Sequence, residues 1–460
     1  MMMRFGSSLL LAVALFAGSG SPVAAGDEAP AGSATDLVFR AELSVAEAKE
    51  VIRELVQRQK AWDILLPNLT TLSPEVAEAI ARPGGFYRIS LPALAWLSPE
   101  SARALALRTG DLDLPGIATL APDTAAAFAG HKGHLELSGL KSLDVEVAAA
   151  LARHSGHLCL SGLTELNPAA AAALAKQAKH LSLPGLTAIS VDTARVLSLH
   201  RGRSLTLAGL TEIPAAVAEA FASHEGELVL PRIAACSAAA AAALARHVGP
   251  LTLDGSFVLT AEIAALLAGH RSTLTLPGRS HLSADVALAL ADHEGALSLP
   301  GIGMLDDDVA AVLSLHRGVL CLPALVSLTA TAAEALSIHQ GTLVLSGLTM
   351  LEPGAAAALL RHAGDIDLYQ LTQTSRLDSA EIAALLAGKT PLLTLPNVQR
   401  LETLASAAVA GALVDAGGAV SIPNLRAATA ETMAILLSRG NVSIPALDTV
   451  DLLPEPLLER

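Results

Sequence analysis

The chain has 460 residues, a formal net charge of −14 at pH 7, and 52% hydrophobic but only 2% aromatic residues. The acidic charge argues against binding to nucleic acid and against electrostatic attachment to anionic lipid, because both need clustered Lys and Arg. Ala and Leu supply most of the hydrophobic residues, so any core must be built from small and medium aliphatic side chains.

Residues 1–25 have the features of an export signal. Arg4 precedes the apolar segment SLLLAVALFAG, and Val23 and Ala25 occupy the −3 and −1 positions of a cleavage site before Gly26. The apolar segment is short for a membrane span, which needs about 20 residues; an uncleaved anchor is the alternative. We therefore expect an exported chain that is periplasmic, in the cell envelope or secreted, with no membrane span after signal removal.

The rest of the chain consists mainly of a repeat, and the step between successive copies is 23 residues in most places. The segments LELSGLKSLDVEVAAALARHSGH and LCLSGLTELNPAAAAALAKQAKH are two consecutive copies. Copies start at the following residues, the last three being looser matches: Ile64, Ile89, Leu112, Leu135, Leu158, Leu181, Leu205, Leu228, Leu251, Leu274, Leu297, Leu320, Leu343, Ile366, Leu393, Val420 and Val442. A divergent copy is expected at Leu37, and the step lengthens to 27 residues after Ile366.

Each copy combines the signals of a short strand and a helix. Apolar residues at the first and third positions alternate as in a strand, and a helix N-cap residue such as Asp144 or Asn167 stands at offset nine. Pro or an acidic residue often follows, and apolar residues then recur at helical spacing until a Gly. One unit cannot bury its apolar stripe alone, so neighbouring units must stack and share one core.

This pattern resembles the leucine-rich repeat family in its L-x-L strand and its period. The resemblance covers roughly residues 37–453, but Leu or Ile replaces the usual Asn of the turn, as at Leu140, Leu163 and Leu186. It implies an α/β solenoid of about 17 strand-turn-helix repeats, a horseshoe or superhelix with a parallel sheet on one face. By analogy, it also implies a protein that binds a partner through the concave face.

The ends of the solenoid are expected to differ from its middle, because terminal repeats must be capped. Residues 26–36 form a Gly/Ala/Ser-rich flexible leader. Residues 37–63 are an N-terminal capping repeat, whose helix starts at Ser44 with the spacing of a capping box. The leucine-rich-repeat-like solenoid then spans 64–453, and 454–460 is a C-terminal tail.

Ten of the fourteen histidines occupy one repeat position, in the last turn of the helix. They are His131, His154, His200, His224, His247, His270, His293, His316, His339 and His362. A metal-binding or pH-sensing column is one interpretation. We prefer a structural one, because a position used in nearly every repeat belongs to the scaffold. The side chains should then face partly inward, bond helix-end carbonyls and be mostly neutral at pH 7.

A second polar group lies on consecutive predicted strands. His134, His157 and His180 immediately precede the strands, and Glu136 and Cys159 share their outward parity. Opposed side chains on neighbouring strands are about 5 Å apart, and imidazole, thiolate and carboxylate are all zinc ligands. These five residues are the candidate metal ligands, and zinc is the only cofactor that the sequence suggests. A plain polar surface is the alternative interpretation.

Asp365, Asp367 and Tyr369 are candidate binding residues. They adjoin the irregular segment YQLTQTSRLDS, and a broken register can mark a ligand-facing loop. A tolerated insertion is the alternative.

The three cysteines are not expected to form a disulfide. Cys159 and Cys321 occupy the same strand position seven strands apart, on the order of 30 Å, whereas a disulfide needs Cα atoms within about 7 Å. Cys236 stands at a core position and is interpreted as packing.

The sequence contains no phosphate-binding glycine loop, nucleophile elbow, metalloprotease helix or paired-cysteine metal motif. It therefore predicts no enzymatic activity. The leading hypothesis is an exported scaffold that binds a protein or cell-envelope component through its concave face. A structural spacer without a dedicated ligand and a metal-binding protein are the alternatives.

Overall fold

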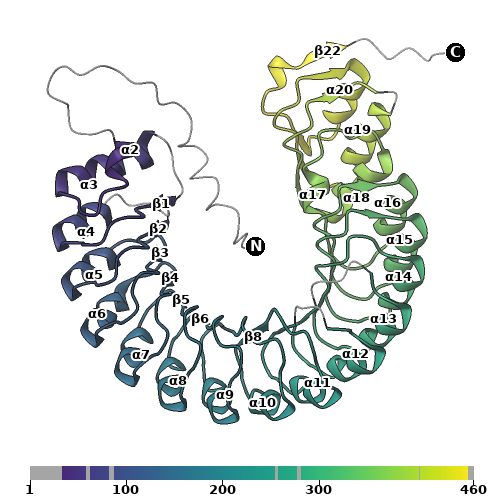
Figure 1. Ribbon diagram of the computed structural model, residues 1–460. Helices are drawn as coiled ribbons and strands as arrows, with labels where there is room; N and C mark the ends of the chain where they lie inside the picture. Colours follow the sequence, from purple (N-terminus) through teal and green to yellow (C-terminus); the bar gives the residue numbers. More distant parts are fainter. Residues whose placement is uncertain are drawn as a thin grey trace, which may run out of the picture.

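The computed structural model describes residues 34–58, 63–81, 88–253, 257–276, 281–403 and 405–453. The expected signal segment 1–25, the leader up to residue 33 and the tail 454–460 lie outside the described residues. The chain forms an open arc, with strands along the inner side and helices along the outer side (Figure 1). The predicted α/β solenoid with a parallel sheet on one face is confirmed.

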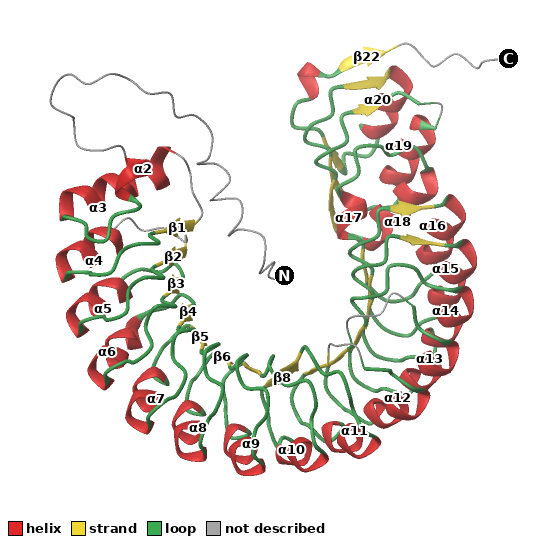
Figure 2. Ribbon diagram, viewed as in Figure 1, coloured by secondary structure: helices red, strands yellow, loops and turns green. Residues whose placement is uncertain are grey.

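Fourteen strands form one parallel sheet along the inside of the arc (Figure 2). They are β1 (Asp63–Leu65), β2 (Arg88–Ser90), β3 (Leu112–Asp113), β4 (Leu135–Glu136), β5 (His157–Cys159), β6 (His180–Ser182), β7 (Ser204–Thr206), β8 (Glu227–Leu230), β9 (Leu251–Leu253), β10 (Leu274–Thr275), β11 (Leu297–Ser298), β12 (Leu320–Cys321), β14 (Leu343–Val344) and β16 (Ile366–Asp367). Successive repeats pair in register, as Leu135 does with Leu158. The first fourteen predicted repeat starts, from Ile64 to Ile366, all lie in these strands.

One helix follows each of these strands on the outer side. The helices are α4 (Pro74–Ala81), α5 (Pro99–Ala106), α6 (Pro122–Ala127), α7 (Val145–Leu151), α8 (Pro168–Leu174), α9 (Val191–Leu197), α10 (Ala215–Ala220), α11 (Ala238–Leu244), α12 (Ala261–Ala268), α13 (Ala284–Ala291), α14 (Asp307–Leu313), α15 (Ala330–Ser337), α16 (Pro353–Leu360) and α18 (Ala380–Lys389). Predicted N-caps are in place: the side chains of Ser98 and Asn167 accept backbone N–H bonds three residues ahead.

The core is a single elongated layer of aliphatic side chains between sheet and helices. Leu135 and Leu137 of one repeat and Leu151 of its helix are fully buried, and the equivalent residues of other repeats are buried in the same way. Each such leucine contributes about 1.5–3 kcal/mol on burial. Stacking therefore stabilises units that could not fold alone.

The inner sheet ends at β16, where the repeat step lengthens. The short helix α17 (Tyr369–Thr372) follows, and the last three predicted repeats form a separate parallel sheet. Its strands are β17 (Leu392–Thr394), β19 (Ala419–Ser421) and β21 (Val442–Ser443), beside helices α19 (Ser406–Asp415) and α20 (Ala430–Leu436). Smaller pairings join β13 (Ser327–Leu328) to β15 (Met350–Leu351), and β18 (Arg400–Leu401), β20 (Ala427–Thr429) and β22 (Asp451–Leu453) to one another.

Helices close the N-terminal end of the described chain. In α3 (Val45–Ile52), Ser44 and Glu47 form the predicted capping box. A π-helix, Arg53–Arg58, continues it. Leu37, which the sequence predicts to start a divergent repeat, is the last residue of helix α2 (Ala34–Leu37). Its side chain is buried against the core. Among the described residues, no helix is both long and apolar enough to cross a membrane.

Candidate functional site

The ten histidines that share one repeat position form a buried column, here called the histidine ladder. All ten side chains are at most 3% exposed. Where two ladder residues occupy consecutive repeats, their ring centroids lie 5.4–6.2 Å apart. The side chains, which the sequence predicts to face partly inward, are buried among the repeats.

Six of the ten ladder rings bond to the repeat that precedes them. The ring nitrogens of His200, His270 and His339 have no hydrogen-bond partner among the described residues. The Nδ1 atom of His131 lies 3.1 Å from the Arg108 carbonyl oxygen, and Nδ1 of His224 lies 3.2 Å from that of Ser198. The Nε2 atom of His362 lies 2.9 Å from the Gly341 carbonyl oxygen. These six rings thus satisfy carbonyl groups at helix ends and turns across repeat boundaries.

Sequence reasoning missed the residues that replace histidine in the same column. Gln177 lies between His154 and His200, and its side-chain amide donates to the Gly156 carbonyl at 2.8 Å. At the C-terminal end of the ladder, the ammonium group of Lys389 donates to the His362 carbonyl oxygen. The regular step of the repeat could have located Gln177, because it is 23 residues after His154.

Burial favours the uncharged form of the ladder imidazoles. Burial, followed by the charge of neighbouring ladder rings, lowers the pKa of His200, His247 and His339 to about 4. Burial also lowers the pKa of His224 and His316. These side chains are therefore neutral at pH 7, which agrees with a structural role.

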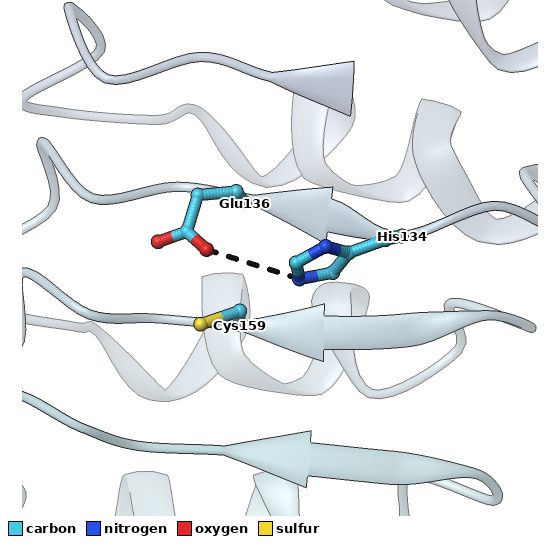
Figure 3. A group of neighbouring side chains, drawn as sticks. All are labelled: His134, Glu136 and Cys159. Atoms are coloured by element: carbon cyan, nitrogen blue, oxygen red, sulfur yellow. Dashed lines mark ion pairs between the residues drawn. The ribbon is translucent and has the colours of Figure 1, made fainter. Parts of the chain in front are cut away.

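The candidate metal site is a cluster of His134, Glu136 and Cys159 (Figure 3), here called the β4–β5 cluster. His134 immediately precedes strand β4, and Glu136 lies in it. Cys159 lies opposite Glu136 on the neighbouring strand β5. One ligand atom from each side chain lies within 4.8 Å of the other two. The distance from His134 Nε2 to Glu136 Oε2 is 3.8 Å.

The β4–β5 cluster is more buried than its outward parity suggested. Cys159 is only 7% exposed, and the side chains of His134 and Glu136 are 13% and 17% exposed. Neighbouring side chains on the same face cover them: the ring of His157 stacks on that of His134 with centroids 4.4 Å apart. The hydroxyl of Ser161 donates to Oε1 of Glu136.

Electrostatics in the cluster disfavour both a free thiolate and a charged imidazole. Burial, followed by the Glu136 carboxylate, raises the pKa of Cys159, so its thiol is protonated at neutral pH. Burial lowers the pKa of His134, although Glu136 opposes this shift. Burial and the nearby His134 ring lower the pKa of His157 to about 4. The cluster consequently holds neutral nitrogen and sulfur donors beside a carboxylate.

The two other candidate ligands are placed differently. His157 adjoins the cluster, and its Nε2 atom is buried without a hydrogen-bond partner among the described residues. The His180 ring is tilted by 58° to that of His157, with the two centroids 5.7 Å apart, and its Nδ1 lies 2.7 Å from the Ser204 hydroxyl. Three of the five predicted ligands therefore converge.

Asp365, Asp367 and Tyr369, the candidate binding residues, are all exposed at the end of the long sheet. The Tyr369 backbone N–H donates to Oδ1 of Asp367 at 3.1 Å, which starts helix α17. The irregular segment therefore coincides with the end of the sheet.

A cavity of about 460 Å³ is lined by the second half of this segment, residues 375–378, and by residues between 397 and 406; Asp365, Asp367 and Tyr369 do not line it. Its lining includes two ion pairs, Arg376 with Asp378 at 3.2 Å and Arg400 with Glu402 at 2.6 Å. These charges neutralise each other within the wall.

All three cysteines are free, as expected. Cys236 is half-buried at the margin of the core, where burial raises the pKa of its thiol.

No protein-family model and no curated protein matches the chain. Among solved structures, a leucine-rich repeat protein of Leptospira interrogans is 15% identical, with 82% of this chain and 93% of that chain covered and a TM-score of 0.32. An internalin of Listeria monocytogenes is 13% identical, with 73% and 93% covered and a TM-score of 0.33. A Toll–Spätzle complex of Drosophila is 11% identical, with 84% and 61% covered and a TM-score of 0.41.

The architecture itself gives the fold class. Each repeat contributes one strand to the inner parallel sheet and one helix to the outer layer, and the core leucines recur at fixed places. The chain is a leucine-rich-repeat-like α/β solenoid.

Proposed function

We propose that this chain is a non-catalytic scaffold that binds a protein or cell-envelope partner through the concave face of its long sheet. The observation that carries the proposal is the sheet itself. Fourteen strands run in register along the inside of the arc, while the helices pack on the opposite side (Figure 1). A long surface with one curvature and one spacing suits an extended partner.

The side chains on this face are small and polar over much of its length. Thr206, Thr252, Thr275 and Ser298 occupy equivalent outward positions on β7, β9, β10 and β11 and are half-buried, and Val229 holds this position on β8. Hydroxyl groups can donate and accept hydrogen bonds. Such a surface offers many weak polar contacts to a partner of matching shape.

Substitution on the concave face tests the proposal. The Thr252→Arg/Thr275→Arg double variant places two bulky charges on the face, and Leu288→Arg places one on the exposed side of α13 as a control. A partner recovered from cell-envelope and secreted fractions should bind the double variant at least about tenfold more weakly, or about 1.4 kcal/mol. Binding to Leu288→Arg should be unchanged. Equal binding by all three proteins contradicts the proposal.

A structural spacer is the second candidate function, and the scarcity of large side chains on the concave face favours it. Interface hot spots are rich in Trp, Tyr and Arg, whereas β9, β10 and β11 present Thr252, Thr275 and Ser298. The same fractions distinguish the two functions. If the chain is a spacer, the wild-type protein should recover no partner from these fractions.

We also infer that the chain is exported, which the apolar segment after Arg4 and the small residues before Gly26 support. Expression with a leader-cleaving export system should release a mature chain starting at Gly26. N-terminal sequencing of the released protein checks this, and a chain retained in the membrane fraction with its first residues intact would indicate an anchor.

A further inference from the structure

We propose that His134, Glu136 and Cys159 bind one zinc ion on the concave face of the sheet. This inference does not depend on partner binding, because it concerns three side chains of the chain itself.

Distances within the cluster are close to those that zinc requires. Zinc lies about 2.0–2.3 Å from nitrogen, oxygen and sulfur ligands, so ligand atoms in a tetrahedral site are roughly 3.3–3.8 Å apart. The 3.8 Å between His134 Nε2 and Glu136 Oε2 is about 0.4 Å longer than a nitrogen–oxygen pair needs. The ligand atoms all lie within 4.8 Å of one another, so the most distant pair must approach by about 1 Å to bind one ion. Small side-chain rotations supply that movement without a change in the strands.

One donor atom of the cluster lacks a hydrogen-bond partner in the described part of the chain. The Nε2 atom of His134 is buried and makes no hydrogen bond among the described residues, which is costly for a polar atom. It faces the Glu136 carboxylate across the position that an ion would occupy (Figure 3). Imidazole, carboxylate and thiolate together form a donor set that zinc accepts in proteins.

Surrounding contacts hold the ligands in place. The Ser161 hydroxyl donates to Oε1 of Glu136 and leaves Oε2 directed towards His134. The backbone N–H of His134 donates to Oδ1 of Asp111 at 2.9 Å, which anchors the entry to β4. Such outer contacts orient metal ligands and raise affinity.

The local charge favours a cation. Glu136 brings a carboxylate into the cluster and Asp111 places another beside it, while the Arg88 guanidinium pairs with Asp113 at 2.7 Å. Three protein ligands leave the fourth tetrahedral position for water or a donor atom arriving from the concave side. Zinc displaces the Cys159 proton to solvent and binds the thiolate, so one proton is released for each ion bound.

Metal titration of the full-length chain tests the site. The protein is freed of metal with a chelator and titrated with zinc chloride, and bound metal is measured by elemental analysis. We expect one zinc per chain, release of one proton, and, with cobalt(II) in place of zinc, the charge-transfer absorption of a thiolate ligand. Cys159→Ser should lose the absorption and the stoichiometric zinc. Cys321→Ser, at the same strand position on β12, should retain both.

Two further variants keep the test decisive if Cys159→Ser unfolds. Glu136→Gln preserves the shape of the side chain and should abolish stoichiometric binding. Ser161→Ala should weaken binding about tenfold while the thiolate absorption persists, because it removes only a supporting contact. Circular dichroism confirms that each variant is folded. No stoichiometric zinc in the wild-type chain, or zinc retained by folded Cys159→Ser and Glu136→Gln, overturns the proposal.

Discussion

At the residue scale, several of the turns that follow a ladder histidine have room only for glycine. A Cβ atom at Gly318 would lie 2.3 Å from the Gly295 carbonyl oxygen and 2.9 Å from the His316 ring. The same conflict recurs at Gly364, where the Gly341 carbonyl oxygen would be 2.2 Å away. Glycine at this position therefore allows neighbouring turns to stack closely.

We expect Gly318→Ala to lower the free energy of unfolding by roughly 1–3 kcal/mol, because the carbonyl of the adjacent repeat must move. Gly411→Ala is the control: no atom lies within 4 Å of its added Cβ, and alanine favours helix α19 by up to about 1 kcal/mol. Thermal unfolding of both variants measures the difference. Similar melting temperatures contradict the close packing of the turns.

Substitution of His316 distinguishes the contribution of its hydrogen bonds to stability from the contribution of its side-chain volume. Its Nε2 lies 3.0 Å from the Gly295 carbonyl oxygen, and the Gly318 N–H donates to its Nδ1 at 3.2 Å. His316→Gln can still donate and accept, as Gln177 donates at the equivalent position. His316→Leu leaves two buried groups unpaired, at about 1–3 kcal/mol each. In urea unfolding, His316→Gln should be clearly more stable than His316→Leu. The reverse order would exclude a hydrogen-bonding role for His316.

At the element scale, the helix starts are uniform except where a cap is missing. Ser98 accepts the Ser101 N–H at 3.1 Å, whereas Ala121 has nearly the same backbone angles but no side chain that can accept. Ala121→Ser should therefore raise the free energy of unfolding by about 1 kcal/mol, and Ser98→Ala should lower it by a similar amount. Chemical denaturation of both variants checks the sign. A loss of stability in Ala121→Ser shows that this cap position is strained.

Strand placement was predictable, because one register explains every copy from Ile64 to Ile366. The end of the long sheet at β16 was not, since a longer step does not reveal whether the extra residues bulge or stop the pairing. Parity correctly placed Glu136 and Cys159 on one face. It could not show that His180 turns to the Ser204 hydroxyl, because side-chain rotation depends on neighbours in other repeats.

At the scale of the whole molecule, the ladder makes stability depend on pH. The unfolded chain binds protons near the ordinary histidine pKa of 6.5, whereas folded His247 and His339 bind them only near pH 4. Their contribution is complete above pH 6.5. It is lost as the pH falls from 6.5 towards 4, by about 1.4 kcal/mol per pH unit for each histidine.

We expect the melting temperature to fall between pH 7.5 and pH 5. Other ladder rings face both groups: His224 and His270 beside His247, and His316 and His362 beside His339. His339→Gln removes one titrating group and should flatten the dependence. A melting temperature that stays constant over this range rules out destabilisation by protonation.

The common register of the repeats also affects how the length of such a chain can change during evolution. Leu297 and Leu320 occupy equivalent places in consecutive units, so deletion of residues 297–319 joins matching points of the backbone. Unequal recombination between such segments would shorten or lengthen the gene in steps of whole repeats and leave a chain that still closes its core. The arc can therefore change its reach by inheritance while its units stay the same. A deletion that takes β4 or β5 would remove the one group of residues proposed to hold an ion.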